Sequence, residues 1–234
     1  SEILQVEELV ELASMILSQR EELNVLFKEP EREQALLGIL QIGTSAGGQR
    51  PKAVIAWNPK TNEVRSGQIK ADKDFEYWIL KFDGITNSKD EAIQSPQGHG
   101  QIEYAYFLMA RDAGITIEDS RLFEENGRRH FMTKRFDRLT GGEKIHMQTL
   151  GSLSHYDYRL AGAYSYEQAF MVMRQLGLPI HDVEEQFRRM VFNVLARNQD
   201  DHVKNIAFVM DKSGTWSLSP AYDLTFSYNP MGKW

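Results

Sequence analysis

The stretch RNQDDHVKN, residues 197–205, contains an aspartate and an asparagine at a spacing that suits phosphoryl transfer. Asp200 and Asn205 are five residues apart, just after an apolar run. In enzymes that transfer phosphoryl groups, such an aspartate accepts the proton of the attacking hydroxyl, and the asparagine holds a magnesium ion. Lys204, between them, could neutralise charge that develops on the transferred group. These residue types therefore favour a catalytic loop over a solvated helix end or a metal site.

Two neighbouring residues each leave two interpretations open. His202 could pack within the loop or take part in proton transfer. Asp223, in LSPAYDLTF, could end a turn or supply a carboxylate ligand to magnesium. A zinc site is disfavoured, because no second histidine stands four residues from His202. Asp201 could cap or tether the loop and receives no catalytic role.

A second pair of candidate residues comes earlier in the chain. Lys81 lies in the strand-like run YWILKFDG, where alternation could also turn it to solvent. Glu103 lies in the helical stretch that follows and could be an ordinary surface carboxylate. A strand lysine paired with a helix glutamate positions the nucleotide phosphates in protein kinases. The order of the two residues predicts the same pairing here.

A glycine-rich stretch, GTSAGGQRPKA at residues 43–53, precedes both groups. Its glycines and small hydroxyl residues allow a close approach of the backbone to an anion. It is not a Walker A motif, because Arg50 and Pro51 stand before Lys52. A plain glycine-rich turn is the alternative. The ordered set of loop, lysine, glutamate and Asp-x4-Asn is more specific than any one member.

The elements that must position these residues follow from hydrophobic periodicity and turn residues. An acidic amphipathic helix is predicted at 4–27, with a short helix through Leu37. The first half is then rich in strands and has one interior helix, whereas the second half is mainly helical. Strands are predicted within 52–69, 75–84, 120–125 and 130–138, helices at 101–112, 165–176 and 181–198, and a hairpin within 205–226. We therefore expect an α+β fold with a first lobe at 1–138 and a second at 139–234.

Composition limits the class of protein. The chain of 234 residues is 41% apolar, enough for a sizeable core, and has no cysteine, which excludes disulfides and thiolate metal sites. Residues 1–34 hold nine acidic and three basic residues and so account for the whole net charge of −6. No basic stripe indicates direct binding to nucleic acid, and no apolar window predicts a membrane span. We expect a cytoplasmic protein.

Several motifs together resemble one family. KRFDR at 134–138, NQDDHVKN at 198–205 and LSPAYDLTFS at 218–227 look like motifs of the HipA family of bacterial serine/threonine kinase toxins. TSAGGQRPKA at 44–53 resembles the phosphate loop of that family. The resemblance covers about residues 40–230. It implies a two-lobed, protein-kinase-like fold that uses ATP and Mg²⁺, with a β-rich first lobe and a mainly helical second lobe.

The resemblance also implies roles for individual residues. It implies that Asp200 is the catalytic base, that Asn205 and Asp223 are magnesium ligands, and that Lys81 binds nucleotide phosphate. Phe136, with the backbone around it, resembles the hinge that meets adenine. On this basis we assign to the nucleotide site Ser45, Ala46, Gly47, Gly48, Lys52, Lys81, Glu103, Lys134, Phe136 and His202.

Regulation and partners are implied in the same way. In the family a serine at the start of the glycine-rich loop is autophosphorylated, which ejects the loop and shuts off the enzyme. Ser45 matches that serine best, and Thr44 is its competitor. A phosphate adds about −1.5 to −2 charge and cannot share the loop with the phosphates of ATP. The implied partners are a protein substrate, an aminoacyl-tRNA synthetase in the best-known members, and a HipB-like antitoxin that binds DNA.

The chain departs from the family at both ends, and two alternatives stay open. Full-length members carry an extra N-terminal subdomain, whereas only about forty residues precede the loop here, and further C-terminal helices are missing. This resembles the shorter HipT-like branch or a piece of a longer chain with an incomplete second lobe. One alternative is a kinase of the same fold that acts on a small molecule or lipid. The other is a pseudokinase that binds nucleotide without turnover, against which Asp200, Asn205 and Asp223 argue.

Overall fold

A computed structural model describes Val10 and residues 52–68, 70–84, 98–139, 141–160 and 162–228. The predicted helices before residue 38, the glycine-rich stretch up to Pro51 and the last six residues lie outside these ranges. The chain forms two compact units. Unit 1 comprises 1–104, 119–135 and 140–143, and unit 2 comprises 105–118, 136–139 and 144–234. Residues 105–118, which the sequence-based division placed in the first lobe, thus belong to unit 2.

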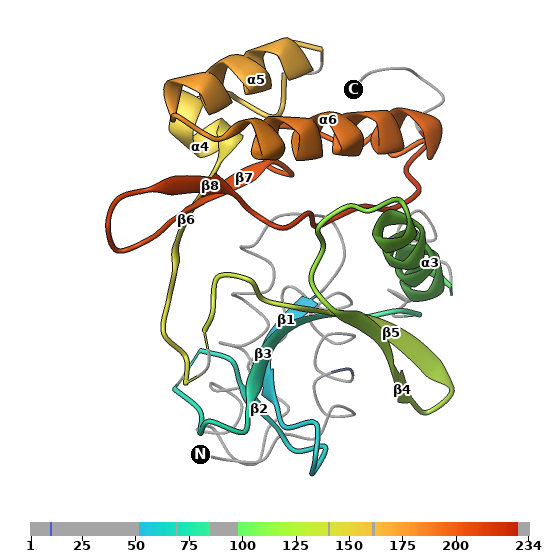
Figure 1. Cartoon of the computed structure of the whole chain (residues 1–234). Helices are drawn as coiled ribbons and strands as arrows, with labels where there is room; N and C mark the ends of the chain where they lie inside the picture. Colours follow the sequence, from blue (N-terminus) through green and yellow to red (C-terminus); the bar gives the residue numbers. More distant parts are fainter. Residues whose placement is uncertain are drawn as a thin grey trace, which may run out of the picture. The chain divides into compact units, whose positions relative to one another are not determined.

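Unit 1 contains one antiparallel sheet of five strands in the order β2-β1-β3-β5-β4 (Figure 1). Its strands are β1 Lys52–Trp57, β2 Val64–Ser66, β3 Glu76–Lys81, β4 Ser120–Glu125 and β5 Arg128–Lys134. All were predicted, although β5 ends four residues earlier than expected. The β4–β5 turn is Asn126-Gly127, and both residues have the positive φ of a type I′ hairpin, +44° and +78°.

The core of unit 1 is built on the central strands of the sheet. β1 is buried along its whole length, which explains why its sequence is apolar at every residue after Lys52. The largest fully buried side chains include Trp78, Leu80 and Met132 from β3 and β5. Trp57 packs edge-to-face on Trp78, with 5.7 Å between ring centroids. This packing holds β3, the strand that carries Lys81.

Helix α3, His99–Asp112, confirms the helix predicted before Gly114. Its first six residues belong to unit 1 and the others to unit 2. The helix ends where Gly114 takes a φ of +75°, a conformation that costs glycine no steric strain. Glu103 is therefore carried on a regular helix.

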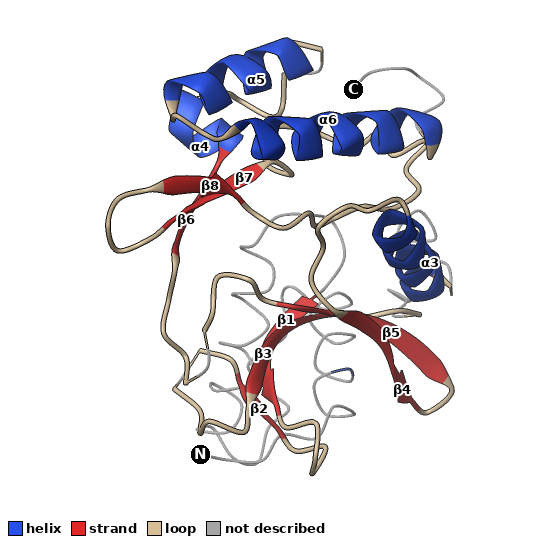
Figure 2. Cartoon of the chain, viewed as in Figure 1, coloured by secondary structure: helices blue, strands red, loops and turns tan. Residues whose placement is uncertain are grey.

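Besides the end of α3, the described part of unit 2 contains a three-stranded antiparallel sheet and three further helices (Figure 2). The strands are β6 His146–Thr149, β7 Ala207–Met210 and β8 Trp216–Leu218, and the helices are α4 Leu150–Ser154, α5 Tyr166–Gln175 and α6 Ile180–Leu195. The β7–β8 hairpin and both longer helices were predicted. β6 and α4 were not, because β6 is a short polar segment that becomes a strand only by pairing with β7.

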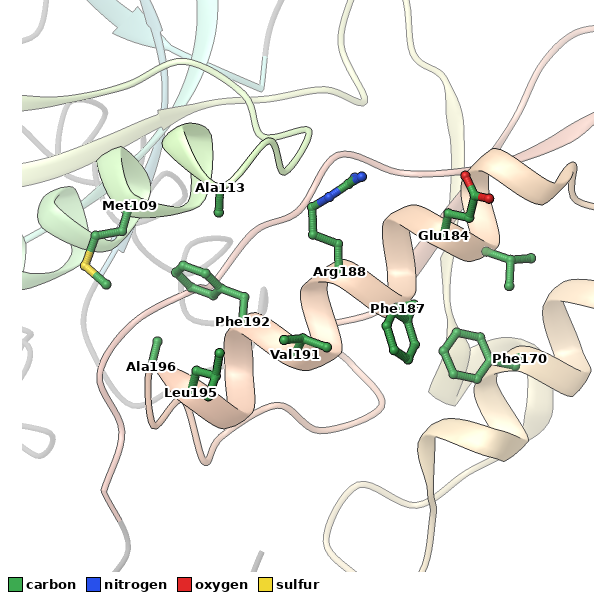
Figure 3. Close-up of a pocket in the computed structure, with 11 residues that line it drawn as sticks. Met109, Ala113, Phe170, Glu184, Phe187, Arg188, Val191, Phe192, Leu195 and Ala196 are labelled. Atoms are coloured by element: carbon green, nitrogen blue, oxygen red, sulfur yellow. The ribbon is translucent and has the colours of Figure 1, made fainter.

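Helix α6 has its polar face turned inward. Glu185 is buried, and its carboxylate accepts hydrogen bonds from the backbone N–H of Thr116 and from Arg189, both at 2.9 Å. The predicted apolar face of α6 is largely exposed, and Leu195 keeps 78% of its surface. With neighbouring residues this face borders a groove of about 950 Å³ within unit 2, shown in Figure 3. The sequence pattern located the apolar face of α6 but not the direction in which it points.

Candidate functional site

The ion pair between Lys81 and Glu103 is the main polar feature of unit 1. Lys81 is the last residue of β3, and its ammonium group donates a hydrogen bond to the Glu103 carboxylate of α3. Their side chains keep only 9% and 2% of their surface exposed. Charges withdrawn from water in this way are stable only when they are paired. The structure therefore excludes the alternatives of a solvated lysine and a surface carboxylate.

Gly100 sets where α3 meets the sheet. A Cβ atom at this position would lie 2.3 Å from the carbonyl oxygen of Arg129 in β5, closer than non-bonded atoms approach. Only glycine allows the first turn of the helix to touch the strand backbone. Because Glu103 lies three residues further along the same helix, this close approach also fixes its distance from Lys81.

A buried cluster around His130, which the sequence reasoning missed, joins the ends of β3 and α3. His130 is fully buried, and its Nδ1 accepts the backbone N–H of Asp83 at 3.0 Å. Nε2 therefore carries the proton and faces Glu125 Oε2 at 3.3 Å. Asp83 Oδ2 accepts the N–H of Gly98, the residue before α3, at 2.9 Å. Burial lowers the pKa of His130, so the ring is held neutral.

Two other lysines assigned to the nucleotide site lie in the same sheet. Lys52 is buried in β1 and stands opposite Lys81 in the β1–β3 register. Lys134, at the end of β5, donates a hydrogen bond to Glu76 at 2.8 Å. The loop residues assigned with them lie outside the described part of the chain: Thr44, Ser45, Ala46, Gly47 and Gly48.

In unit 2, Asp200 and Asn205 belong to one ordered loop. The Asn205 amide nitrogen donates a hydrogen bond to the backbone carbonyl of Asp200 at 2.7 Å, and its backbone N–H donates to the carbonyl of His202. The loop is attached to α4 through Gly151, whose N–H donates to the carbonyl of Val203 at 3.0 Å. The loop geometry is therefore set by hydrogen bonds at both the backbone and the side-chain level.

Helix α6 ends three residues earlier than predicted, so residues 196–198 lead into the Asp200 loop instead of continuing the helix. The helix stops at Leu195, and Arg197 takes a left-handed φ of +55°. The backbone then runs beside Ser227, whose carbonyl accepts the N–H of Gln199 at 2.9 Å. Asp200 follows directly, so its position depends on a segment almost thirty residues further along the chain.

Burial, two neighbouring carboxylates and one histidine influence the charge of Asp200. Burial raises the pKa of the Asp200 carboxyl above its usual range, His202 opposes this, and the nearby carboxylates of Asp223 and Asp201 add to it. His202 Nε2 lies 3.7 Å from Asp200 Oδ1. Asp223 takes a φ of +56°, which aspartate tolerates better than most residues. The Asp223 carboxylate is thus near enough to Asp200 to influence its charge.

Two cationic or titratable residues of the loop contact Tyr158. The Lys204 ammonium lies 3.2 Å from the centroid of the Tyr158 ring. The His202 ring packs edge-on against the same tyrosine, with 5.6 Å between centroids. The backbone carbonyl of Lys204 accepts a hydrogen bond from Tyr222. Lys204 is therefore held by a cation–π contact in this structure.

Asp201 acquires a partner that the sequence did not reveal. Its carboxylate accepts a hydrogen bond from the Tyr166 hydroxyl at the start of α5. Tyr166 in turn accepts the Asn193 amide of α6 at 3.0 Å, and Asn193 accepts the Asn198 amide at 3.0 Å. Burial raises the pKa of Tyr166, so the hydroxyl stays protonated and can donate. Asp201 is thus tied to two helices.

The oxygens near Asp200 suit a magnesium ion that is shared with a nucleotide. Mg²⁺ prefers carboxylate and carbonyl oxygens and binds through one or two protein groups plus phosphates. Because the Asn205 nitrogen is bonded to the Asp200 carbonyl, its amide oxygen is turned away from that carbonyl. Within the described ranges, no cluster of three or more His, Cys, Asp or Glu could hold a metal by itself. Asn205 and Asp223 therefore fit a phosphate-assisted site better than a resident metal centre.

Phe136, the residue assigned to the adenine hinge, lies in a turn after β5. Its ring is 5.8 Å from the ring of Tyr222, tilted by 38°. Tyr222 directly precedes Asp223, and burial raises its pKa. Phe136 of the KRFDR motif and Tyr222 of the AYD motif both belong to unit 2, and their rings connect the two motifs there.

Comparison with known proteins identifies what this arrangement is similar to. The model of the HipA-like C-terminal domain family matches residues 44–233. A protein of Sinorhizobium fredii named putative kinase Y4dM is 32% identical over 182 residues, which cover 69% of this chain and 43% of that protein. A putative kinase of Haemophilus influenzae is 28% identical over 159 residues, with 61% and 46% covered. This chain thus spans less than half of each.

A solved structure has the same fold. HipA of Shewanella oneidensis MR-1, determined with HipB and its operator DNA, superposes with a TM-score of 0.65 at 17% identity. The match covers 96% of this chain and 50% of that one. The mixed α and β fold with its antiparallel sheet is therefore kinase-like, as predicted. No helix in the described ranges is long and apolar enough to cross a membrane.

Proposed function

This chain belongs to the HipA-like C-terminal domain family, and on that premise we propose that it is an ATP- and Mg²⁺-dependent kinase acting on a serine or threonine hydroxyl of a protein. The observation that carries the proposal is the buried ion pair of Lys81 and Glu103. A buried strand lysine held by a helix glutamate is the arrangement with which kinases orient nucleotide phosphates. The order of this pair, Asp200, Asn205 and Asp223 along the chain supports the same reaction.

In the proposed reaction, Lys81 binds the phosphates of ATP, and Asn205 and Asp223 hold Mg²⁺, which neutralises phosphate charge when bound. Asp200 accepts the proton of the acceptor hydroxyl. The hydroxyl oxygen forms a bond to the γ-phosphorus, and the bond from that phosphorus to the β–γ bridging oxygen breaks, which releases ADP. Catalysis consists mainly of positioning and charge stabilisation. Lys204 can assist in the latter only after it leaves the Tyr158 ring.

Incubation of the chain with Mg·ATP, followed by mass spectrometry, tests this function. We expect one phosphate on Ser45 or Thr44 and none in Asp200→Ala, while that variant still binds ATP. Transfer that continues undiminished in Asp200→Ala would contradict the role of Asp200. A phosphate on a lipid or small polyol, with none on protein, would favour the alternative substrate class.

We also propose a HipB-like DNA-binding antitoxin as partner, since the Shewanella HipA structure contains HipB and operator DNA. An aminoacyl-tRNA synthetase is the protein substrate proposed from the family resemblance. Size-exclusion chromatography of the chain mixed with a HipB-like protein tests the first, and labelled-phosphate transfer to purified synthetases tests the second. Separate elution of the two proteins would count against the antitoxin proposal. Synthetases that stay unlabelled while the chain itself is autophosphorylated would count against the substrate proposal.

A further inference from the structure

A cavity of about 190 Å³ opens beside Asp200 within unit 2. Asp200, Asp201 and His202 line it on the side of the catalytic loop, and Tyr158, Leu160 and Tyr164 line it on the side of the segment before α5. Neither Asn205 nor Asp223 is among its lining residues. The cavity therefore borders the proposed base but not the proposed metal ligands, as an acceptor site should.

Part of the cavity wall is apolar and belongs to the core, whereas Ser165, Gln199, Asp200, Asp201 and His202 make the rest of the wall polar. Leu150, Val203 and Ile206 line it and also belong to the buried core of unit 2. Tyr164 stacks on Tyr156 with 4.2 Å between ring centroids, and its hydroxyl accepts the N–H of Asp157 at 2.9 Å. Such preformed apolar walls favour an apolar guest, because burial removes its surface from water.

The charges around the cavity disfavour an anionic guest. Asp200 and Asp201 both line it, and its lining within the described ranges includes no lysine or arginine. The nearby Lys204 ammonium is engaged with the Tyr158 ring. A phosphorylated sugar, nucleotide or lipid headgroup would meet two carboxylates and no lysine or arginine in this lining, so electrostatics disfavour these acceptors.

The size of the cavity suits one side chain rather than a whole ligand. Pockets for small molecules measure roughly 300–1,000 Å³, and this cavity is smaller. Resting on the proposed function, we propose that it receives an apolar or aromatic side chain next to the acceptor hydroxyl of a peptide. The hydroxyl then meets Asp200 while its neighbour fills the cavity. The acceptor class is thus a Ser or Thr flanked by Leu, Phe or Tyr.

Peptide phosphorylation by the full chain tests the proposal. Peptides with one central Ser carry Phe, Gly, Lys or Asp at each neighbouring position in turn. We expect a kcat/KM at least about tenfold higher for Phe than for Gly at one position, the discrimination typical of an apolar pocket, and the lowest value for Asp. Equal kcat/KM for all four residues at every position would overturn the proposal and leave the kinase function intact.

Leu160→Lys reports on the cavity itself. Leu160 is 56% exposed, and its hydrogen bonds to Asp157 and Ala163 involve only backbone atoms, so this variant should fold. We expect its Phe preference to fall about tenfold and Asp to become tolerated. Met171→Lys, equally exposed at 55% on α5 but outside the cavity lining, is the matched control and should keep the wild-type preference. An unchanged preference in Leu160→Lys would refute the location.

A binding measurement separates this proposal from the proposed function. The same peptides with Ala in place of Ser are titrated calorimetrically into the wild type and Leu160→Lys. Tighter binding of the Phe peptide, lost in Leu160→Lys, supports the cavity even if no phosphoryl transfer is detected, in which case the proposed function alone fails. Equal affinity of the Phe, Gly and Asp peptides rejects the cavity even if transfer occurs.

Discussion

The Tyr166 hydroxyl at the start of α5 donates a hydrogen bond to the carboxylate of Asp201, the residue next to the proposed base. Because Tyr166 also accepts the Asn193 amide, one hydroxyl connects α5, α6 and the catalytic loop. We therefore expect Asp201 to act as a positioning residue through the backbone of Asp200.

Removal of this hydroxyl should loosen the loop. Tyr166→Phe leaves Asp201 and Asn193 without their common partner, and a loss of about 1–3 kcal/mol in unfolding free energy is expected. If Asp201 acts by positioning, kcat should fall roughly tenfold while KM for ATP changes little. Chemical denaturation and steady-state kinetics measure the two effects. Tyr106→Phe removes a hydroxyl that is bonded to the Ala196 carbonyl and lies outside the cavity lining, so it is a control for stability alone. A kcat unchanged in Tyr166→Phe would refute the positioning role.

Variants of Lys81 and Glu103 distinguish the effect of an unbalanced buried charge on stability from the effect of the lysine on ATP binding. Lys81→Met removes the charge that pairs with the buried Glu103 carboxylate and should destabilise the chain by about 3–5 kcal/mol. Lys81→Met combined with Glu103→Leu removes both charges and should recover most of that stability. Both variants should lose ATP affinity, since only the lysine carries the positive charge. Urea denaturation and nucleotide titration test this, and full ATP affinity in the double variant would contradict the role of Lys81.

The raised pKa of Asp200 predicts that its charged carboxylate lowers the stability of the folded chain, although phosphoryl transfer requires it. Burial and neighbouring carboxylates disfavour its charged form, so the carboxylate lowers stability at pH values above its unfolded pKa, 3.8. Asp200→Asn should abolish transfer and raise the unfolding free energy at pH 7, by an amount that solvent screening keeps small because 49% of the Asp200 side chain is exposed. The gain should shrink as pH falls, because the wild-type carboxyl then becomes protonated. The acid limb of kcat/KM should also lie above pH 3.8, and a stability loss in Asp200→Asn at pH 7 would contradict this account.

His130 should make unit 1 sensitive to acid. Its pKa is lowered in the folded chain, so between that value and the unfolded value near 6.5 the unfolded state binds more protons. Its contribution is fully present above about pH 6.5 and is lost as pH falls. His130→Gln should be less stable at pH 7 but should flatten the decline between pH 7 and 5. His181→Gln, at an exposed position of α6, should leave the slope unchanged, and equal slopes in both variants would exclude His130 as the cause.

Much of the candidate site followed from local sequence. The strand that carries Lys81, the helix that carries Glu103 and the hairpin before Asp223 have periodicities and turn residues that act over a few neighbours. The spacing of Asp200 and Asn205 is likewise a local property, and the hydrogen bond between them spans only that loop. Such features can be predicted from the sequence because they depend only on residues that are close together along the chain.

Tertiary contacts decided which helix faces and which polar side chains are buried. The exposed apolar face of α6 has the same sequence pattern as a buried one, and its polar face turns inward because Glu185 finds Thr116, a residue 69 positions away. His130 meets Asp83 across 47 residues, and Asp201 meets Tyr166 across 35. The sequence by itself determined which elements form and which residues could do chemistry. Only the folded structure decided which polar groups are buried and paired, because burial depends on partners that local patterns do not specify.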